Sequence, residues 1–354
     1  MTSSVAAWPV TFLVASPHGD LPYAPELADV PLEGCPLSTT YGEYFAGLRD
    51  FCLGAGHAAL LEAAGRTVTT GDVTELVLKA QKHGALYHPA SIEVRFPGGR
   101  ALLGANVATS PHGWAALARE QVVLSRLSRE VPEAGLPRPL CFDEGDRLDI
   151  LLVDWFSGFH EFHATSGGGA VAWDFDGGGL TPLGPDTAEE IFRQAARILA
   201  LCLDVESGAR IWPWRHAAGD FVVRSDGGGV ETRLITARGY GPSALGGGER
   251  GLLHFFLTTT LFMRLDRLDG VGERVFLPGW CLSTAAAGLL STLMQRPDVQ
   301  KHVPDLAAAL RRVTPDAWLD ILMADTEFCT DPDAAFLLDC LPKHISELSG
   351  ILSR

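Results

Sequence analysis

The sequence has no segment with the features of a membrane anchor or of a secretory leader. Its longest apolar stretches, such as 251–262, are too short and too often interrupted by polar residues to span a bilayer. The first residues, MTSSVAAWPV, lack both the positive charge and the long apolar core of a signal peptide. We therefore expect a protein that is not integral to a membrane and that is cytoplasmic.

Cysteine is scarce and scattered. Seven cysteines occur singly, their number is odd, and no two of them are spaced as a Cys-x-x-Cys pair. This pattern argues against a disulfide framework and against a zinc site made of thiolates. We expect the cysteines to be small buried hydrophobic residues in a reducing compartment.

Positive charge is also in deficit. The chain has 28 Lys and Arg against 43 Asp and Glu, which gives a formal net charge of −15. Because binding to nucleic acids and to anionic membrane surfaces depends on clustered positive charge, the chain is a poor candidate for either. An anionic small-molecule ligand would need a local cationic pocket. The Gly-x-Ser-x-Gly and His-Glu-x-x-His fingerprints are absent as well.

The chain does contain a full complement of core residues. With 354 residues, of which 47% are hydrophobic and 20% charged, it is expected to fold as two packed units. Residues 1–40 are rich in proline and small residues, which favours an irregular strap. Helical apolar spacing at 41–64 predicts a helix, and the capped start at 70–75, followed by Leu76-Val77-Leu78, predicts another.

The next segments show strand and helix patterns in turn. Alternation in SIEVRF (91–96), the Pro-Gly-Gly turn after it and the extended pattern at 100–107 predict a β-hairpin. The charged run at 264–270 is typical of a solvated helix end with ion pairs three residues apart, and an internal salt bridge that locks helices of the C-lobe together is the second possibility. The other expected elements are a helix at 111–127, strands at 136–142, 149–155 and 170–176, a helix at 187–203, a hairpin at 221–237 and helices from 252 onward.

A hairpin, a helix, two strands and a mainly helical remainder together resemble the layout of the protein-kinase-like superfamily. The resemblance covers residues 80–300. It implies an α+β, two-lobed protein-kinase-like fold with a small β-rich N-lobe and a larger, mainly helical C-lobe. The corresponding domains are a strap and helical extension at 1–75, the N-lobe at 76–160 and the C-lobe at 161–354.

Glu120 is the first candidate functional residue. It falls in the middle of the apolar face that Leu117, Val123 and Leu124 form on the expected helix, so its carboxylate must be paired. In kinases the glutamate of this helix pairs with a strand lysine that holds the nucleotide phosphates. A glutamate at the lobe boundary, bonded to the backbone or to a surface arginine, fits the sequence equally well.

The strand that would carry the lysine departs from the kinase pattern. It has no lysine; Asn106 is the polar residue nearest the expected position, and Arg100 is the nearest cation. Lys82 lies where the resemblance places the nucleotide-binding loop, so we expect the segment Lys82–Pro89 to lie near Asn106. An asparagine can bond a phosphate oxygen but cannot neutralise its charge.

His160 and Glu161 belong to a segment, 154–163, where a kinase chain crosses between its lobes and where adenine would stack. Three interpretations of the run His160-Glu161-Phe162-His163 remain open. They are a metal site, a set of polar residues that contact a ligand or the other lobe, and ordinary loop polarity.

The segment 211–241 is the most informative. Kinases of the aminoglycoside phosphotransferase and choline kinase families have a His-Gly-Asp-x4-Asn loop, a hairpin and an Ile-Asp-Phe/Trp segment. Residues 212–237 resemble this layout, and the lipopolysaccharide-core sugar kinases are similar again. Aligned on the hairpin, the resemblance puts Arg215 at the catalytic aspartate, Asp220 at the metal-binding asparagine and Thr236 at the second metal ligand.

Two other interpretations compete for this segment. A rival register matches His216 and Asp220 to the His and Asp of the loop, but it leaves too few residues before the hairpin. A turn held by bonds from Asp220 to the backbone would explain the same residues without catalysis. On the preferred register, Asp220 and Thr236 should face each other at the open end of the hairpin.

The resemblance implies one of two functions. The first is an ATP-dependent phosphotransferase acting on a small hydroxylated compound such as a sugar, with ATP and Mg²⁺ as cofactors and Asp220 as a metal ligand. The second is a pseudokinase that binds a ligand or a partner without turnover, which the altered signature positions favour. An enzyme unrelated to kinases is the third possibility.

Overall fold

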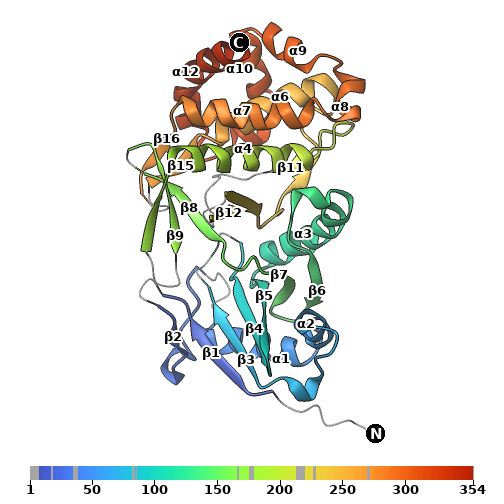
Figure 1. Ribbon diagram of the computed structural model, residues 1–354, viewed down its shortest axis with the longest axis vertical. Helices are drawn as coiled ribbons and strands as arrows, with labels where there is room; N and C mark the ends of the chain where they lie inside the picture. The colour runs from blue at the N-terminus through green and yellow to red at the C-terminus, as the bar shows by residue number, and fades with distance from the viewer. Residues whose placement is uncertain are drawn as a thin grey trace. The chain divides into compact units, whose positions relative to one another are not determined.

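The computed structural model describes residues 8–16, 19–34, 39–81, 84, 86–165, 167–174, 179–212, 220–225, 229–268 and 272–353 (Figure 1). The protein is of the mixed α+β class. It divides into two compact units, each of which is described by itself. Unit 1 comprises residues 1–126, 137–157 and 175–177, and unit 2 comprises residues 127–136, 158–174 and 178–354.

Unit 1 is built on a seven-stranded sheet. Its strand order is β2-β1-β3-β4-β5-β7-β6; β1 runs parallel to β3, and every other neighbouring pair is antiparallel. The strands are β1 (Val10–Val14), β2 (Leu21–Pro22), β3 (Glu75–Ala80), β4 (Ala90–Phe96), β5 (Gly99–Ala108), β6 (Pro139–Glu144) and β7 (Asp149–Asp154).

One face of this sheet carries the hydrophobic core of unit 1. Alternate residues of β3, β4 and β5 are buried against α1 (Tyr41–Leu53) and α2 (His57–Ala64), since successive side chains of a strand point to opposite faces. The hydroxyl of Tyr44 donates to the carbonyl of His88 at 2.9 Å, which fixes α1 to the start of β4. The helix α3 (Pro111–Glu130) follows β5 in the chain and precedes β6.

Unit 2 contains a five-stranded antiparallel sheet and most of the helices. The sheet order is β10-β9-β8-β12-β13, and two short strand pairs, β11 with β14 and β15 with β16, lie outside it. The strands are β8 (His160–Ala164), β9 (Ala170–Asp174), β10 (Gly179–Leu183), β11 (Arg210–Ile211), β12 (Phe221–Ser225), β13 (Val230–Leu234), β14 (Tyr240–Gly241), β15 (Leu265–Arg267) and β16 (Arg274–Phe276).

The helices α4 and α7 of unit 2 pack closely against each other. The backbones of these two helices come close at Gly288, where an added Cβ would lie 2.4 Å from the carbonyl oxygen of Arg193. The hydroxyl-rich α6 is buried along most of its length. The helices are α4 (Pro185–Leu201), α6 (Gly248–Phe262), α7 (Gly279–Leu293), α8 (Pro297–His302), α9 (Leu306–Arg312), α10 (Pro315–Met323), α11 (Thr326–Cys329) and α12 (Ala334–Leu352).

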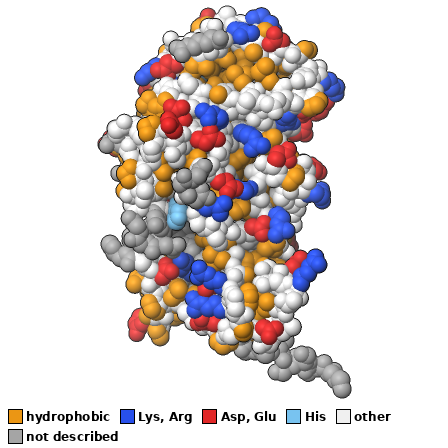
Figure 2. All heavy atoms as spheres, in the orientation of Figure 1, with side chains coloured by type: hydrophobic (Ala, Val, Ile, Leu, Met, Phe, Trp, Pro, Cys, Tyr) orange, Lys and Arg blue, Asp and Glu red, His pale blue; other side chains and the backbone are white. Residues whose placement is uncertain are grey.

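Most of the elements expected from the sequence are present. The hairpin β4–β5, the helices α3 and α4, and the strands β6, β7 and β9 lie within a few residues of their expected positions, and the mixed α+β class is confirmed. Among the described residues, none of the helices combines the length and the apolar character needed to cross a membrane. Figure 2 shows acidic and basic side chains interspersed on the face in view.

The prediction of a helix from residue 70 is wrong. Thr69 and Asp72 do form a capping box, but it closes a single turn of 3-10 helix, Thr70–Asp72, and β3 begins three residues later. Capping residues stabilise the start of any helical turn, whereas tertiary packing decides whether the helix continues beyond that turn. Here Leu76 and Leu78 enter the core between neighbouring strands, so the chain continues as a strand.

Two other expectations are also corrected. Residues 1–40 are not wholly irregular, because β1 pairs with β3 and joins the sheet. The run 264–270 does not end a solvated helix: Arg264 and Asp266 are buried, and β15 pairs with β16. The alternative of an internal salt bridge fits better, because Arg264 pairs with Glu347 of α12 at 2.8 Å. The carboxylate of Asp266 accepts the backbone N–H of Ala164 at 2.6 Å, a tertiary bond that local spacing does not reveal.

Candidate functional site

The hairpin β12–β13 places Asp220 and Thr236 at its open end. Phe221 pairs with Leu234 in the ladder, and the N–H of Ile235 donates to the carbonyl of Asp220 at 3.0 Å. Ile235 therefore lies opposite Asp220, and Thr236 is the next residue along the chain. The side chains of Asp220 and Thr236 are both buried, with 5% and 8% exposure.

Asp220 is bound by an arginine. Nη2 of Arg238 contacts Oδ1 of Asp220 in a charge-assisted hydrogen bond, and Arg238 retains 27% exposure of its side chain. A buried carboxylate needs a compensating charge, because its desolvation otherwise costs several kcal/mol. Arg238 supplies that charge from the same segment that carries Thr236.

A second contact holds the other end of the 235–241 segment. β14 pairs with β11, and the N–H of Trp212 donates to the carbonyl of Gly239 at 2.7 Å. Asp220 and Trp212 are thus both bonded to this segment, one toward each end. The residues between them, which include the candidates Arg215 and His216, lie outside the described residues, as does Lys82.

A buried polar network anchors β11. Arg210 is fully buried, its guanidinium lies 3.5 Å from the carboxylate of Asp325, and its Cζ lies 5.1 Å from the centroid of the Trp212 ring. His254 contacts Asp325 at 2.8 Å and Ser243 at 3.2 Å. Burial alone would raise the pKa of Asp325, but His254 and Arg210 outweigh it and hold that pKa below its usual range. The network fixes the strand that precedes Trp212.

Glu120 and Asn106 both lie in unit 1. Glu120 lies in α3 and is completely buried, as expected for a carboxylate on the apolar face of that helix. Asn106 lies in β5 opposite Leu151 of β7, and alternation turns it to the sheet face away from the core residues Ala105 and Val107. The N–H of His88 donates to the carbonyl of Val107 at 2.8 Å, so the last residues of the segment 82–89 lie beside Asn106.

His160 and Glu161 lie on β8 and pair with Val223 and Val222 of β12. Glu161 approaches His163 at 3.7 Å, and the ring of His163 packs edge-on against Trp173 with 4.9 Å between centroids. Within the part of the chain that the structure describes, no group of three or more His, Cys, Asp or Glu side chains is placed to hold a metal ion. His160, Glu161 and His163 are therefore surrounded by neighbouring residues of the five-stranded sheet.

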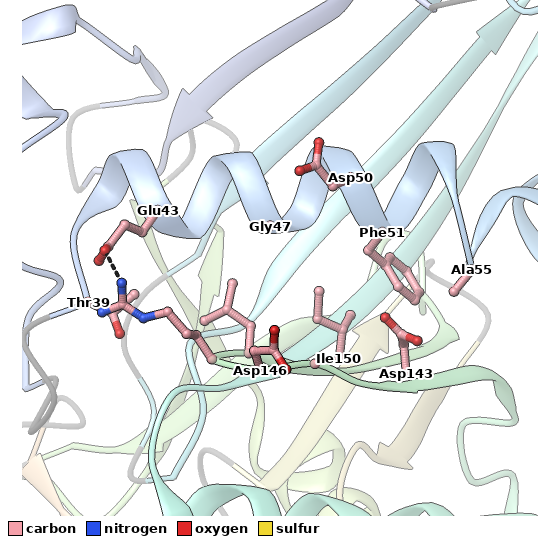
Figure 3. A pocket seen from close by; sticks show the side chains of 12 residues that line it. Thr39, Glu43, Gly47, Asp50, Phe51, Ala55, Asp143, Asp146 and Ile150 are labelled. Atoms are coloured by element: carbon pink, nitrogen blue, oxygen red, sulfur yellow. Dashed lines mark hydrogen bonds and ion pairs between the residues drawn. The ribbon is translucent and has the colours of Figure 1, made fainter. Parts of the chain in front are cut away.

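Unit 1 also carries a groove of about 460 Å³ between α1 and the β6–β7 turn (Figure 3). Its floor includes Phe51 and Ile150, and an ion pair between Glu43 and Arg147 closes one end. Sequence reasoning missed this groove, because its two walls are about 90 residues apart in the chain. Four carboxylates and one guanidinium line it, so it repels phosphate groups and is not a candidate nucleotide site.

The chain was compared with families and with individual proteins. No protein-family model matches it, and no curated protein matches it either.

Proposed function

We propose that this chain is a divergent protein-kinase-like protein that binds a nucleotide and transfers phosphoryl groups slowly or not at all. The proposal is supported by the order of elements in unit 1, where a hairpin (β4–β5) is followed by a helix (α3) and two further strands (β6 and β7). These four strands are antiparallel neighbours in one sheet. This is the layout that the resemblance to a kinase N-lobe implies.

The hairpin of unit 2 carries the functional part of the argument. At its open end Asp220 is paired with Arg238, and Thr236 lies two residues before Arg238 in the chain. Asp220 and Thr236 are the two positions that the resemblance assigns to metal ligands. Phosphoryl transfer depends on positioning and on neutralising the charge of the phosphates. With a hydroxyl at one ligand position and an arginine bound to the other, these residues favour ligand binding over efficient transfer.

An active phosphotransferase acting on a small hydroxylated compound is the second candidate. Asp220 favours it, because a carboxylate at the end of this hairpin is a suitable oxygen ligand if the Arg238 contact opens. The first experiment separates these functions by combining thermal unfolding with a turnover assay. ATP, ADP and GTP are each added with Mg²⁺ or with EDTA, and ATP consumption is followed with and without sugars and amino alcohols as acceptors.

We expect ATP to raise the unfolding temperature and to be consumed slowly or not at all. A nucleotide at 100 times its Kd stabilises the folded state by about 2.7 kcal/mol, which is readily measured. If no nucleotide at millimolar concentration changes the unfolding temperature, the proposed function is wrong. Rapid, acceptor-dependent consumption of ATP would instead establish the second candidate.

A further inference from the structure

We propose that the groove of unit 1, between α1 and the β6–β7 turn, binds a linear aliphatic polyamine. The methylene chain of the ligand lies on the apolar floor, and its ammonium groups pair with Asp143 and Asp146. The inference goes beyond the proposed function, because none of the residues that line the groove is one that the resemblance assigns to a nucleotide or to a metal.

The groove has the size and the floor of a small-molecule site. Its volume of about 460 Å³ falls within the range of about 300–1,000 Å³ that is usual for such sites. Phe51 of α1 and, from the opposite wall, Leu148 and Ile150 supply apolar surface (Figure 3). Gly47 allows the two walls to approach, because an added Cβ would lie 2.4 Å from Cδ1 of Leu148. Such a floor favours a hydrocarbon chain, since binding removes apolar surface from water.

Two carboxylates on the wall opposite α1 can accept a cation. Within the part of the chain that the structure describes, neither Asp143 nor Asp146 forms a hydrogen bond or an ion pair. The other two acidic residues that line the groove, Glu43 and Asp50, are each bonded to an arginine. Figure 3 shows Asp143 and Asp146 at different points along the groove. Each of them can therefore bind an ammonium group without breaking an existing contact.

The turn that carries these carboxylates has an excess of negative charge. Asp149, which is buried at the start of β7, has a raised pKa; burial is the main cause, and the charges of Glu144 and Asp143 add to it. The N–H of Gly145 donates to Asp149 at 3.2 Å but does not offset these effects. The guanidinium of Arg147 is already paired with a carboxylate of α1. A ligand with several positive charges relieves this repulsion, which a neutral ligand cannot do.

The arrangement favours an extended cation over a metal ion. A metal ion needs several oxygen ligands that converge on one point at about 2.0–2.6 Å, whereas these two carboxylates lie at different points along the groove. A polyamine has its ammonium groups separated by methylene segments, so one group can pair with each carboxylate. The methylene segments between them cover the floor, as the aliphatic stem of a lysine covers apolar surface while its charge stays in water.

Calorimetry with spermidine as the probe tests this inference. The full chain is titrated with spermidine and with octanediol, an uncharged chain. Asp143→Asn combined with Asp146→Asn removes the carboxylates of the groove. The matched control is Glu26→Gln combined with Glu144→Gln, which removes the same charge from exposed side chains of unit 1 outside the groove. We expect spermidine to bind the parent and the control equally well, the groove variant to bind about tenfold more weakly, and octanediol not to bind measurably.

A further variant tests the place of binding without changing any charge. Ala55 is exposed and lines the groove at the end away from Glu43 (Figure 3). The indole of Ala55→Trp fills this end, so the variant should weaken spermidine binding as well. Thermal unfolding checks each variant: because Asp143 and Asp146 make no hydrogen bond or ion pair in the described part of the chain, their replacement should leave Tm unchanged.

Weaker binding by both groove variants but not by the control supports the inference. An equal loss in the control overturns it, because spermidine then responds to the net charge of −15 and not to the groove. Displacement of spermidine by an equal concentration of Mg²⁺ or Ca²⁺ also overturns it, in favour of a metal site. Tighter binding of a tetralysine peptide through the same residues overturns it in favour of a protein partner. Each of these outcomes leaves the proposed function standing, since nucleotide binding is measured separately.

Discussion

His344 shows how a single buried side chain sets the response of this protein to acid. Its ring lies in unit 2 with Nε2 3.2 Å from the hydroxyl of Thr260 and Nδ1 3.4 Å from the guanidinium of Arg264. Burial, together with the positive charge of Arg264, lowers the pKa of His344 to about 3. The folded state therefore keeps this imidazole neutral at pH values where the unfolded chain protonates it.

The first prediction concerns stability between pH 6.5 and pH 3. In that window the unfolded chain binds the additional proton, so the contribution of His344 to the free energy of unfolding falls by about 1.4 kcal/mol for each pH unit as the solution is acidified. Above pH 6.5 the effect is absent. Denaturant unfolding of the parent chain at pH 7.0 and pH 4.5 should show a loss of about 2.7 kcal/mol from this residue.

His344→Gln should reduce this acid dependence, because glutamine cannot take up a proton. His112→Gln, which replaces an exposed histidine at the start of α3, is measured alongside as the control for the substitution itself. An equal loss of stability on acidification in parent and His344→Gln would contradict the assignment.

The individual residues of the candidate site could be predicted only in part from the sequence. Asp220 could be placed at the end of a hairpin, because the glycine-rich turn at 225–229 indicates where the two strands meet. The expected register was wrong by one residue, since Ile235, and not Thr236, lies opposite Asp220. Arg238 was overlooked, since it follows Asp220 by 18 residues and no local pattern links the two. The sequence nevertheless contained one indication, since Arg238 follows the candidate metal ligand Thr236 by two residues.

Gly288 of α7 and Gly350 of α12 show that the effect of a helical glycine on stability depends on what packs against it. Gly288 of α7 lies against the backbone of α4, and an added Cβ would be 2.4 Å from the carbonyl oxygen of Arg193 and 3.2 Å from the Cβ of Ala196. Gly350, in the last turns of α12, has open space at the corresponding position, with nothing within 4 Å beyond its own helix. The two glycines therefore differ only in their surroundings.

The second prediction is that alanine has opposite effects at these two positions. Gly288→Ala should destabilise the protein by about 1–3 kcal/mol, because the methyl group pushes two helix backbones apart. Gly350→Ala should stabilise it by about 0.5–1 kcal/mol, the difference in helix propensity. Chemical denaturation of both variants provides the comparison. Stabilisation by Gly288→Ala would show that α4 and α7 are not in tight contact at this position.

Elements with strong local patterns were predicted well, and those made by long-range contacts were not. The hairpin β4–β5 follows from alternation and from the turn at 97–99, both of which are local. By contrast, β1 becomes a strand only because it pairs in parallel with β3, more than 60 residues later. Asp266 likewise reads as part of a charged surface run until the distant N–H of Ala164 is known.

At the scale of the whole molecule, the excess of acidic residues lowers the stability of the folded state through electrostatic repulsion. Ion pairs between exposed side chains, such as Arg193 with Glu190 and Lys301 with Glu206, contribute little to stability, because solvent and salt screen them. They leave a net charge of −15 distributed over the chain. Compact states with a large net charge are destabilised by self-repulsion, and that repulsion is screened by salt.

The third prediction follows from this balance. Raising NaCl from 10 to 150 mM shortens the Debye length from about 30 Å to about 8 Å, which should weaken repulsion across the molecule more than it weakens contacts within ion pairs. At pH 7.5 we therefore expect Tm to rise by about 1–2 °C, which in a chain of this size corresponds to on the order of 1 kcal/mol of added stability. The control is the same titration near pH 5.1, the isoelectric point of the sequence, where the rise should vanish. A fall in Tm with NaCl at pH 7.5 would show instead that attraction within ion pairs outweighs the net repulsion.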